Sequence, residues 1–148
     1  MADRFAIPLD KARGIGNRVR NGIRYRKIDS DYTDWSDMIN AGGVGEGNCK
    51  DFAMTGGQML ARWLQNIGVP DDVVGRSIRL VIFDTRAEHD PKANHVACTI
   101  WDGKCWRVCA DTMEKAEWSA AIVDLDYPAI EFCLLDDLLH FHDWEEVA

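Results

Sequence analysis

Apolar residues recur with helical spacing near the start of the chain. Residues 8–22 carry Ile15 and Val19 on one stripe, which continues to Ile23, and Pro8 stands early in the segment. Proline is favoured in the first turn of a helix, where its missing N–H is not needed. The pattern therefore predicts a first helix over residues 8–22.

A second helical pattern starts behind a glycine-rich stretch, in the sequence "GEGNCKDFAMTGGQML". Asn48 is a good N-cap residue, so Cys49 is predicted to be the first residue of the helix. Gly68 and Pro70 are predicted to end it. The apolar face consists of Phe52, Met59, Leu60, Trp63, Leu64 and Ile67. The pattern places a thiol at the N-terminus of a long amphipathic helix.

Most of the other segments have strand patterns. Residues 76–85 predict a strand, and residues 94–113 predict a hairpin around Asp102 and Gly103. Residues 128–147 predict an extended segment followed by a short helix. The segment "WSDMIN" predicts a short helix capped by Ser36 or Asp34. The order of helices and strands predicts an α+β fold, in which the helix that bears Cys49 packs on an antiparallel sheet.

The pattern of apolar residues predicts the register of the hairpin. A pairing in which residue numbers sum to 206 collects apolar residues on one face and leaves His95, Thr99, Arg107 and Asp111 on the other. That apolar face consists of Val96, Cys98, Ile100, Trp106, Val108 and Ala110. A one-residue slip would invert the side chains, so the cleaner pattern is preferred. This register places His95 directly opposite Asp111, within reach of a hydrogen bond.

Composition limits the class of protein. The 148 residues suit a single domain over 1–148, and 47% of them are hydrophobic. No apolar run is long enough to span a membrane, and the first residues lack the apolar core of a secretory signal. We therefore expect a cytoplasmic protein with no membrane partner. The odd number of cysteines favours free thiols over a disulfide framework, and the C-x3-C spacing of Cys105 and Cys109 matches zinc sites poorly.

Charge is unevenly distributed. The chain has a net charge of −8, but residues 4–27 carry eight basic residues against one acidic residue, Asp10. Such a segment could contact nucleic acid or an acidic partner. Aromatic residues are not interleaved with the basic ones, which argues against a nucleic-acid motif. We expect a helix with a solvated basic face.

Three residues together indicate nucleophilic catalysis. A helix N-terminus favours the thiolate form of Cys49, and His95 with Asp111 would form an oriented acid–base pair. This is the thiol version of the nucleophilic triad. The backbone N–H of Cys49 would be one oxyanion donor, and the indole N–H of Trp35 is the candidate for the second.

The same motifs resemble a known family. The segments "GEGNCKDFA", "NHVACTIW" and "WRVCADTM" are similar to the three motifs of the bacterial transglutaminase-like cysteine peptidases, whose fold is papain-like. The resemblance covers roughly residues 15–113. It implies Cys49 as the nucleophile, His95 as the base and Asp111 as the orienting acid. A chain this short would suit a minimal or phage-borne version of the family.

Two residues depart from the family pattern. Asn48 and Lys50 stand where relatives carry acidic residues, and some relatives bind calcium through such carboxylates. Only Asp51 remains as a candidate calcium ligand. We therefore expect no required cofactor, with calcium as the alternative.

The residues leave several functions open. The first is a cysteine peptidase that hydrolyses a peptide bond of a protein or peptide substrate. The second keeps the thioester chemistry but acts on glutamine side chains or small amides, as a transglutaminase, deamidase or amidase. The third is a non-catalytic binding domain of the same fold. A metal site at His140, His142 and Asp143 is a further, weaker alternative.

Overall fold

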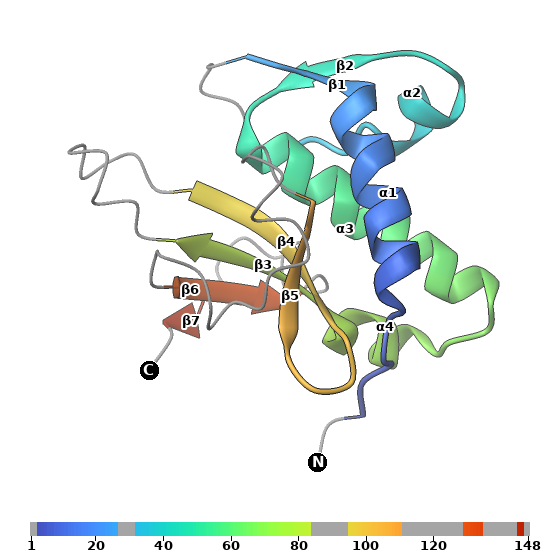
Figure 1. Cartoon of the computed structure of the whole chain (residues 1–148), viewed down its shortest axis with the longest axis vertical. Coiled ribbons are helices and arrows are strands. Elements are labelled where there is room, and N and C mark those ends of the chain that lie inside the picture. The colour runs from blue at the N-terminus through green and yellow to red at the C-terminus, as the bar shows by residue number, and fades with distance from the viewer. Residues whose placement is uncertain (1–2, 27–31, 84–94, 111–128, 135–144, 147–148) are drawn as a thin grey trace.

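The computed structural model describes residues 3–26, 32–83, 95–110, 129–134 and 145–146. Its four helices are α1 (Leu9–Gly22), α2 (Ser36–Asn40), α3 (Cys49–Asn66) and α4 (Asp71–Ser77). Its strands are β1 (Ile23–Tyr25), β2 (Gly45–Gly47), β3 (Ile78–Phe83), β4 (His95–Trp101), β5 (Trp106–Ala110), β6 (Ala129–Leu134) and β7 (Glu145–Glu146). Figure 1 shows their arrangement. No helix in these ranges is long and apolar enough to cross a membrane.

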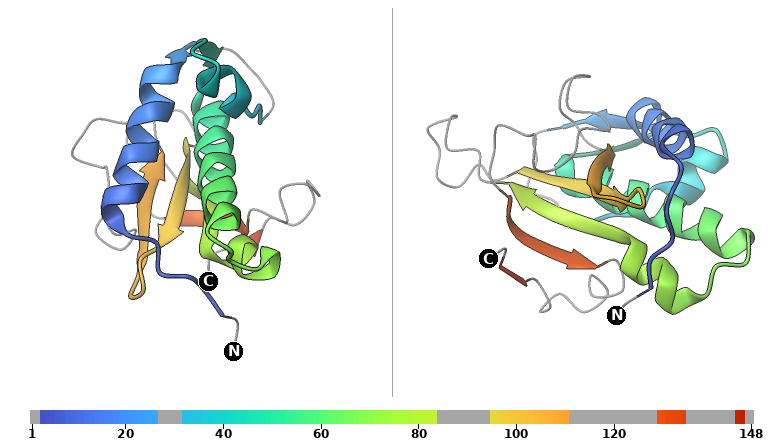
Figure 2. Two further views of the ribbon diagram at one scale, coloured as in Figure 1. Left: turned by 90° about the vertical axis from the view of Figure 1, so that its right-hand side faces the viewer. Right: turned by 60° about the horizontal axis from the view of Figure 1, so that its bottom comes forward.

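The main sheet has five strands in the order β5-β4-β3-β6-β7, and each neighbouring pair is antiparallel. A separate pair of short strands, β1 and β2, is parallel and lies beside the N-terminus of α3. Helices α1 and α3 stand side by side on one face of the main sheet (Figure 2). Helix α3 packs on β3 and β4, and α1 packs on β5.

The core lies between these two helices and the sheet. Helix α1 contributes every third or fourth residue, as its amphipathic pattern predicts, and α3 contributes a broader face because it lies against both α1 and the sheet. The central members are Ala12, Ile15, Val19, Phe52, Leu60, Leu64, Leu80, Cys98 and Ile100. The α+β class with a cysteine-bearing helix packed on an antiparallel sheet is therefore confirmed.

Most helix boundaries agree with the sequence prediction. The first helix spans Leu9–Gly22, Asn48 caps α3, and Gly68 adopts a left-handed φ of 91° just past its end. Helix α2 begins at Ser36, and the backbone N–H of Ser36 donates to Asp34 at 2.8 Å. The N-cap position itself is Trp35, whose side chain makes no capping bond, so neither predicted residue is the N-cap.

One helix was missed. The predicted strand over 76–85 begins only at Ile78, because residues 71–77 form α4. Pro70 precedes this helix, and Asp71 and Asp72 lie in its first turn, where carboxylates are stabilised by the helix dipole. These residues were the overlooked sequence signal.

The predicted hairpin register is wrong. Trp101 pairs with Trp106, a sum of 207, and Cys98 pairs with Ala110, a sum of 208. The loop between β4 and β5 has four residues, and Asp102 stabilises it. Its carboxylate accepts hydrogen bonds from the backbone N–H groups of Lys104 at 2.7 Å and Cys105 at 2.8 Å, and Arg107 binds its second oxygen. These bonds and the guanidinium of Arg107 hold the pKa of Asp102 well below its usual range.

A second irregularity is the bulge between Cys98 and Thr99. Cys109, rather than Val108, belongs to the core cluster beneath the helices. Burial could not select the register because Ala97 and Thr99 are also fully buried, although neither belongs to that cluster. With both faces of β4 buried, an apolar pattern does not distinguish one register from the next.

Candidate functional site

The site begins with Cys49, the first residue of the 18-residue helix α3, whose side chain is half-buried. Asn48 adopts the extended backbone of an N-cap, and its side chain accepts a hydrogen bond from Lys50 N–H at 3.0 Å. The helix begins where the sequence predicts. Cys49 therefore occupies the end of the helix dipole that favours an anion.

Asp51 anchors this helix N-terminus to the rest of the molecule. Its side chain is 1% exposed, and its two oxygens accept hydrogen bonds from Asn48 N–H at 2.9 Å and Thr33 N–H at 3.0 Å. The first bond completes a capping box with Asn48. The second bond ties the segment before α2 to the same carboxylate, so Asp51 positions the residue next to Cys49 as well as the loop in front of it.

Gly47 makes this arrangement possible. A Cβ atom at residue 47 would overlap the Asp51 carboxylate, which lies against the backbone there. Gly45 serves the same purpose for Trp35, because a Cβ at residue 45 would overlap the indole ring. The glycine-rich stretch before Cys49 is thus required for close packing rather than for a phosphate.

Trp35 lies against the strand that leads to Cys49. Its backbone N–H donates to the hydroxyl of Thr55 at 3.0 Å, and that hydroxyl donates to the carbonyl of Thr33 at 3.2 Å. Its indole Nε1 is buried and has no hydrogen-bond partner among the described residues. A buried unused donor is costly. The assignment of Trp35 as an oxyanion donor stays a prediction.

His95 is the first residue of β4 and is half-buried. It pairs with Phe83 of the neighbouring strand β3. Helix α3 packs along β4, and the two run in the same general direction, so their N-terminal ends lie at the same end of the molecule (Figures 1 and 2). Cys49 and His95 begin these two elements. The structure therefore brings the predicted nucleophile and the predicted base to one end of the helix–sheet layer.

Asp111 lies outside the described residues, so its pairing with His95 stays a prediction. The residue before it, Ala110, ends β5 and pairs with Cys98, three positions along β4 from His95. The predicted register, in which His95 faces Asp111 directly, is wrong, as described above.

Two arginines and a glutamate form a cluster of opposite charges next to the start of α3. Glu46, on β2, accepts a hydrogen bond from Arg26 at 2.7 Å, and Arg24 lies 3.6 Å from its other oxygen. The bond to Arg26 lowers the pKa of the Glu46 carboxyl, and the same bond raises the pKa of Arg26. Lys50 lies over the ring of Tyr32. One carboxylate thus faces two guanidinium groups next to the start of α3.

The other described cysteines have different environments. Cys98 and Cys109 are buried, and Cys109 donates to the carbonyl of Ala12 at 3.3 Å. A hydrogen bond between the two thiols, together with burial, raises the pKa of Cys98. Cys105 is half-buried in the hairpin loop. Among these thiols, Cys49 alone lies at a helix N-terminus.

The role of Asp51 as a calcium ligand stays a prediction. Both oxygens of this buried carboxylate accept a hydrogen bond from a backbone N–H group, and calcium would require several further oxygen ligands. No group of three or more His, Cys, Asp or Glu side chains that could hold a metal occurs within the described ranges. His140, His142 and Asp143 lie outside these ranges.

Sequence reasoning missed the structural contribution of Asp51, Gly47 and Thr55. The first had a recognisable signal, because Asn48 followed three residues later by an acidic residue is a variant of the capping box. The contributions of Gly47 and Thr55 depend on which segment packs against the start of α3. No local pattern indicates that the loop before α2 lies there.

No family model matches the chain, and no curated protein matches its sequence. The structure is similar to solved structures of Legionella pneumophila LapG. For the EGTA-treated protein the TM-score is 0.56 at 16% identity, covering 85% of this chain and 63% of that one. For the calcium-bound protein the TM-score is 0.55 at 18% identity, covering 84% and 65%. The chain spans less than two thirds of the LapG chains it matches.

LapG has a papain-like, transglutaminase-like fold. At this level of identity the similarity concerns the fold and not the activity. The resemblance of the sequence motifs and the similarity of the structures indicate the same fold. The chain therefore has a papain-like, transglutaminase-like α+β fold.

Proposed function

We propose that this protein is a cysteine peptidase that hydrolyses a peptide bond through a thioester intermediate. The observation that carries the proposal is the placement of Cys49 at the N-terminus of α3, at the same end of the molecule as the first residue of β4, His95. The fold shared with LapG, a transglutaminase-like cysteine peptidase, supports the same assignment.

The proposed chemistry has two steps. The Cys49 thiolate attacks the carbonyl carbon of the scissile bond, and the backbone N–H groups at the start of α3 stabilise the developing oxyanion. His95, protonated by the thiol, donates this proton to the leaving amine, and the C–N bond breaks to leave a thioester. Water then attacks the thioester while His95 accepts its proton, and the thiol is regenerated. Asp111 orients His95 throughout.

The test of this proposal is a comparison of two reactions. The protein is incubated with a mixed peptide library and, separately, with casein and a fluorescent amine, and products are identified by mass spectrometry. We expect new peptide termini from the library and no covalent amine incorporation into casein. The Cys49→Ala variant, run in parallel, should produce neither.

Other outcomes would support different functions. Amine incorporation without new termini would replace hydrolysis by transglutamination, which uses the same thioester. Release of ammonia from glutamine side chains would indicate a deamidase or amidase. If none of these products forms above the level of the Cys49→Ala variant, the non-catalytic alternative is favoured.

Thiol reactivity gives a prediction that does not depend on the substrate. Cys49 should be alkylated by iodoacetamide faster than Cys105, although both are half-buried, because only Cys49 lies at a helix N-terminus. Cys98 and Cys109 should react slowest because they are buried. Mass spectrometry of labelled peptides at several pH values measures each rate. Equal rates for Cys49 and Cys105 would contradict the nucleophile assignment.

A further inference from the structure

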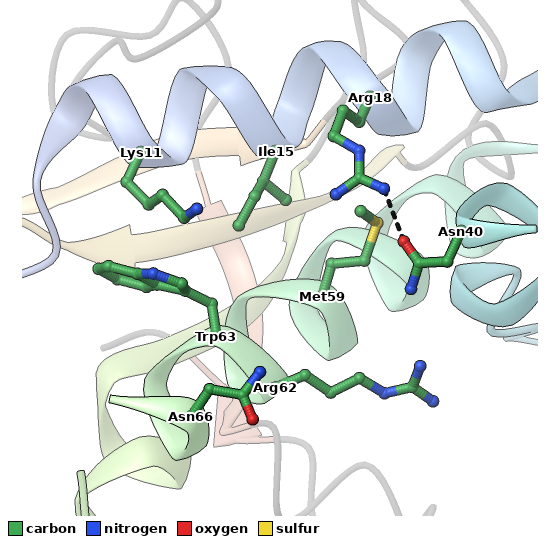
Figure 3. A pocket seen from close by; sticks show the side chains of 8 residues that line it. All are labelled: Lys11, Ile15, Arg18, Asn40, Met59, Arg62, Trp63 and Asn66. Atoms are coloured by element: carbon green, nitrogen blue, oxygen red, sulfur yellow. Dashed lines mark hydrogen bonds between the residues drawn. The ribbon is translucent and has the colours of Figure 1, made fainter. Parts of the chain in front are cut away.

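A cationic groove lies between α1 and α3, at some distance from Cys49. Its volume is about 200 Å³. Figure 3 shows the side chains that surround it: Lys11, Ile15 and Arg18 from α1, Asn40 from α2, and Met59, Arg62, Trp63 and Asn66 from α3. No carboxylate is among these lining residues.

Two of the three cations in the groove, Lys11 and Arg18, have no anionic partner among the residues that the structure describes. Arg62 is neutralised outside it, by Asp37 at 2.7 Å and Asp34 at 3.5 Å. Arg18 instead donates to the neutral amide of Asn40 at 2.6 Å, and the Lys11 amine lies 5.1 Å from the centroid of the Trp63 ring. Within the described residues neither Lys11 nor Arg18 forms an ion pair. Their charge is available to a ligand.

The floor of the groove is apolar. Ile15 lies between the two cations on α1, and Met59 faces it from α3; both are nearly buried, at 5% and 6% exposure. Lys11, Ile15 and Arg18 have the i, i+4, i+7 spacing of one helix face. The α-carbons of Lys11 and Arg18 are therefore about 10 Å apart along the helix axis, at about 1.5 Å per residue.

This geometry selects the shape of a ligand. A partner needs two carboxylates about 10 Å apart with an apolar side chain between them on the same face, which a helix provides at positions i, i+4 and i+7. An extended strand covers that distance in three residues, but its first and fourth side chains point to opposite faces. A groove between two helices is also a common binding site for a third helix.

We propose that the α1–α3 groove binds an acidic amphipathic helix of a partner protein. Carboxylates of that helix pair with Lys11 and Arg18, and an apolar side chain between them lies on Ile15 and Met59. Nucleic acid fits less well, because the net charge of −8 repels a continuous polyanion and the apolar floor would remain unused.

The groove is independent of the proposed peptidase site. Met59 lies ten residues beyond Cys49 on the same helix, about 15 Å along its axis. Binding of the partner helix should therefore be unchanged in the Cys49→Ala variant, so the two proposals can fail separately.

The test uses a fluorescein-labelled helical peptide of about 16 residues on an alanine-rich background. It carries a glutamate, a leucine four residues later and a second glutamate three residues after that. Fluorescence anisotropy should show saturable binding to the full-length protein, weakened by salt. The Lys11→Gln/Arg18→Gln double variant should bind roughly tenfold more weakly, because two exposed ion pairs are lost.

The chain offers a matched control on the same helix. Arg13 and Arg20 have the same seven-residue spacing but do not line the groove, so Arg13→Gln/Arg20→Gln removes equal charge elsewhere. This variant should bind the peptide like the unmodified protein. The proposal is overturned if the unmodified protein does not bind the peptide, if a glutamine-for-glutamate peptide binds equally well, or if the two double variants lose equal affinity. Displacement of the peptide by duplex DNA at a lower concentration than unlabelled peptide would also overturn it.

Discussion

Cys49→Ala is expected to lower the rate of peptide cleavage by about 10⁴-fold or more, because the nucleophile that forms the thioester is lost. The fold should persist, since Cys49 is half-buried at the end of a helix whose cap is made by Asn48 and Asp51. The measurement is kcat/KM on a peptide that the unmodified protein cleaves. Circular dichroism checks the fold of the variant.

Cys105→Ala is the matched control, because it also removes one half-buried cysteine side chain. It should retain full activity. Within the proposed triad, Asp111→Asn should lower kcat by orders of magnitude while leaving the thiol in place, since the correct tautomer of His95 would no longer be held. Activity that survives in Cys49→Ala would exclude the proposed mechanism, and unchanged kcat in Asp111→Asn would remove Asp111 from it.

Gly47→Ala is expected to have the largest effect on stability of the substitutions considered for the described residues. The new Cβ would overlap the Asp51 carboxylate, which is held by two backbone N–H groups and is almost fully buried. Either the carboxylate moves and leaves those donors unpaired, or the backbone shifts. We expect the free energy of unfolding to fall by about 3 kcal/mol. In a thermal melt this lowers Tm by roughly 10 °C.

Gly14→Ala is the control for the same chemical change. Gly14 is an exposed residue within α1, and an added Cβ there would have no neighbour within 4 Å. Alanine should stabilise this helix by about 0.5–1 kcal/mol, because glycine is a poorer helix former. If Gly47→Ala were as well tolerated as Gly14→Ala, the anchoring of the α3 N-terminus by Asp51 would not matter for stability.

Several features of the candidate site could be predicted because they depend on neighbours in sequence. The start of α3 at Cys49 follows from the N-cap Asn48 and an apolar stripe with helical spacing. The start of β4 at His95 follows from a run of apolar residues typical of a buried strand. Both are properties of a single segment, and the structure confirms both.

The hairpin shows where such reasoning fails. Its loop was correctly placed at Asp102 and Gly103, but its register depends on side-chain hydrogen bonds within a four-residue loop and on a bulge between Cys98 and Thr99. Burial on both faces of β4 removed the contrast that a pattern argument needs. A correct turn position therefore did not imply a correct pairing.

The sequence by itself determined the α+β class, the helix that carries Cys49 and the strand that begins with His95, because capping and periodicity act over a few residues. Only the tertiary structure decided that these two elements begin at the same end of the molecule, that Asp51 binds the backbone of Thr33, and that Lys11 and Arg18 flank a groove with α3. An apolar face indicates that a helix or strand is buried, but it does not indicate which other element packs against it. That choice is made by packing across the whole chain.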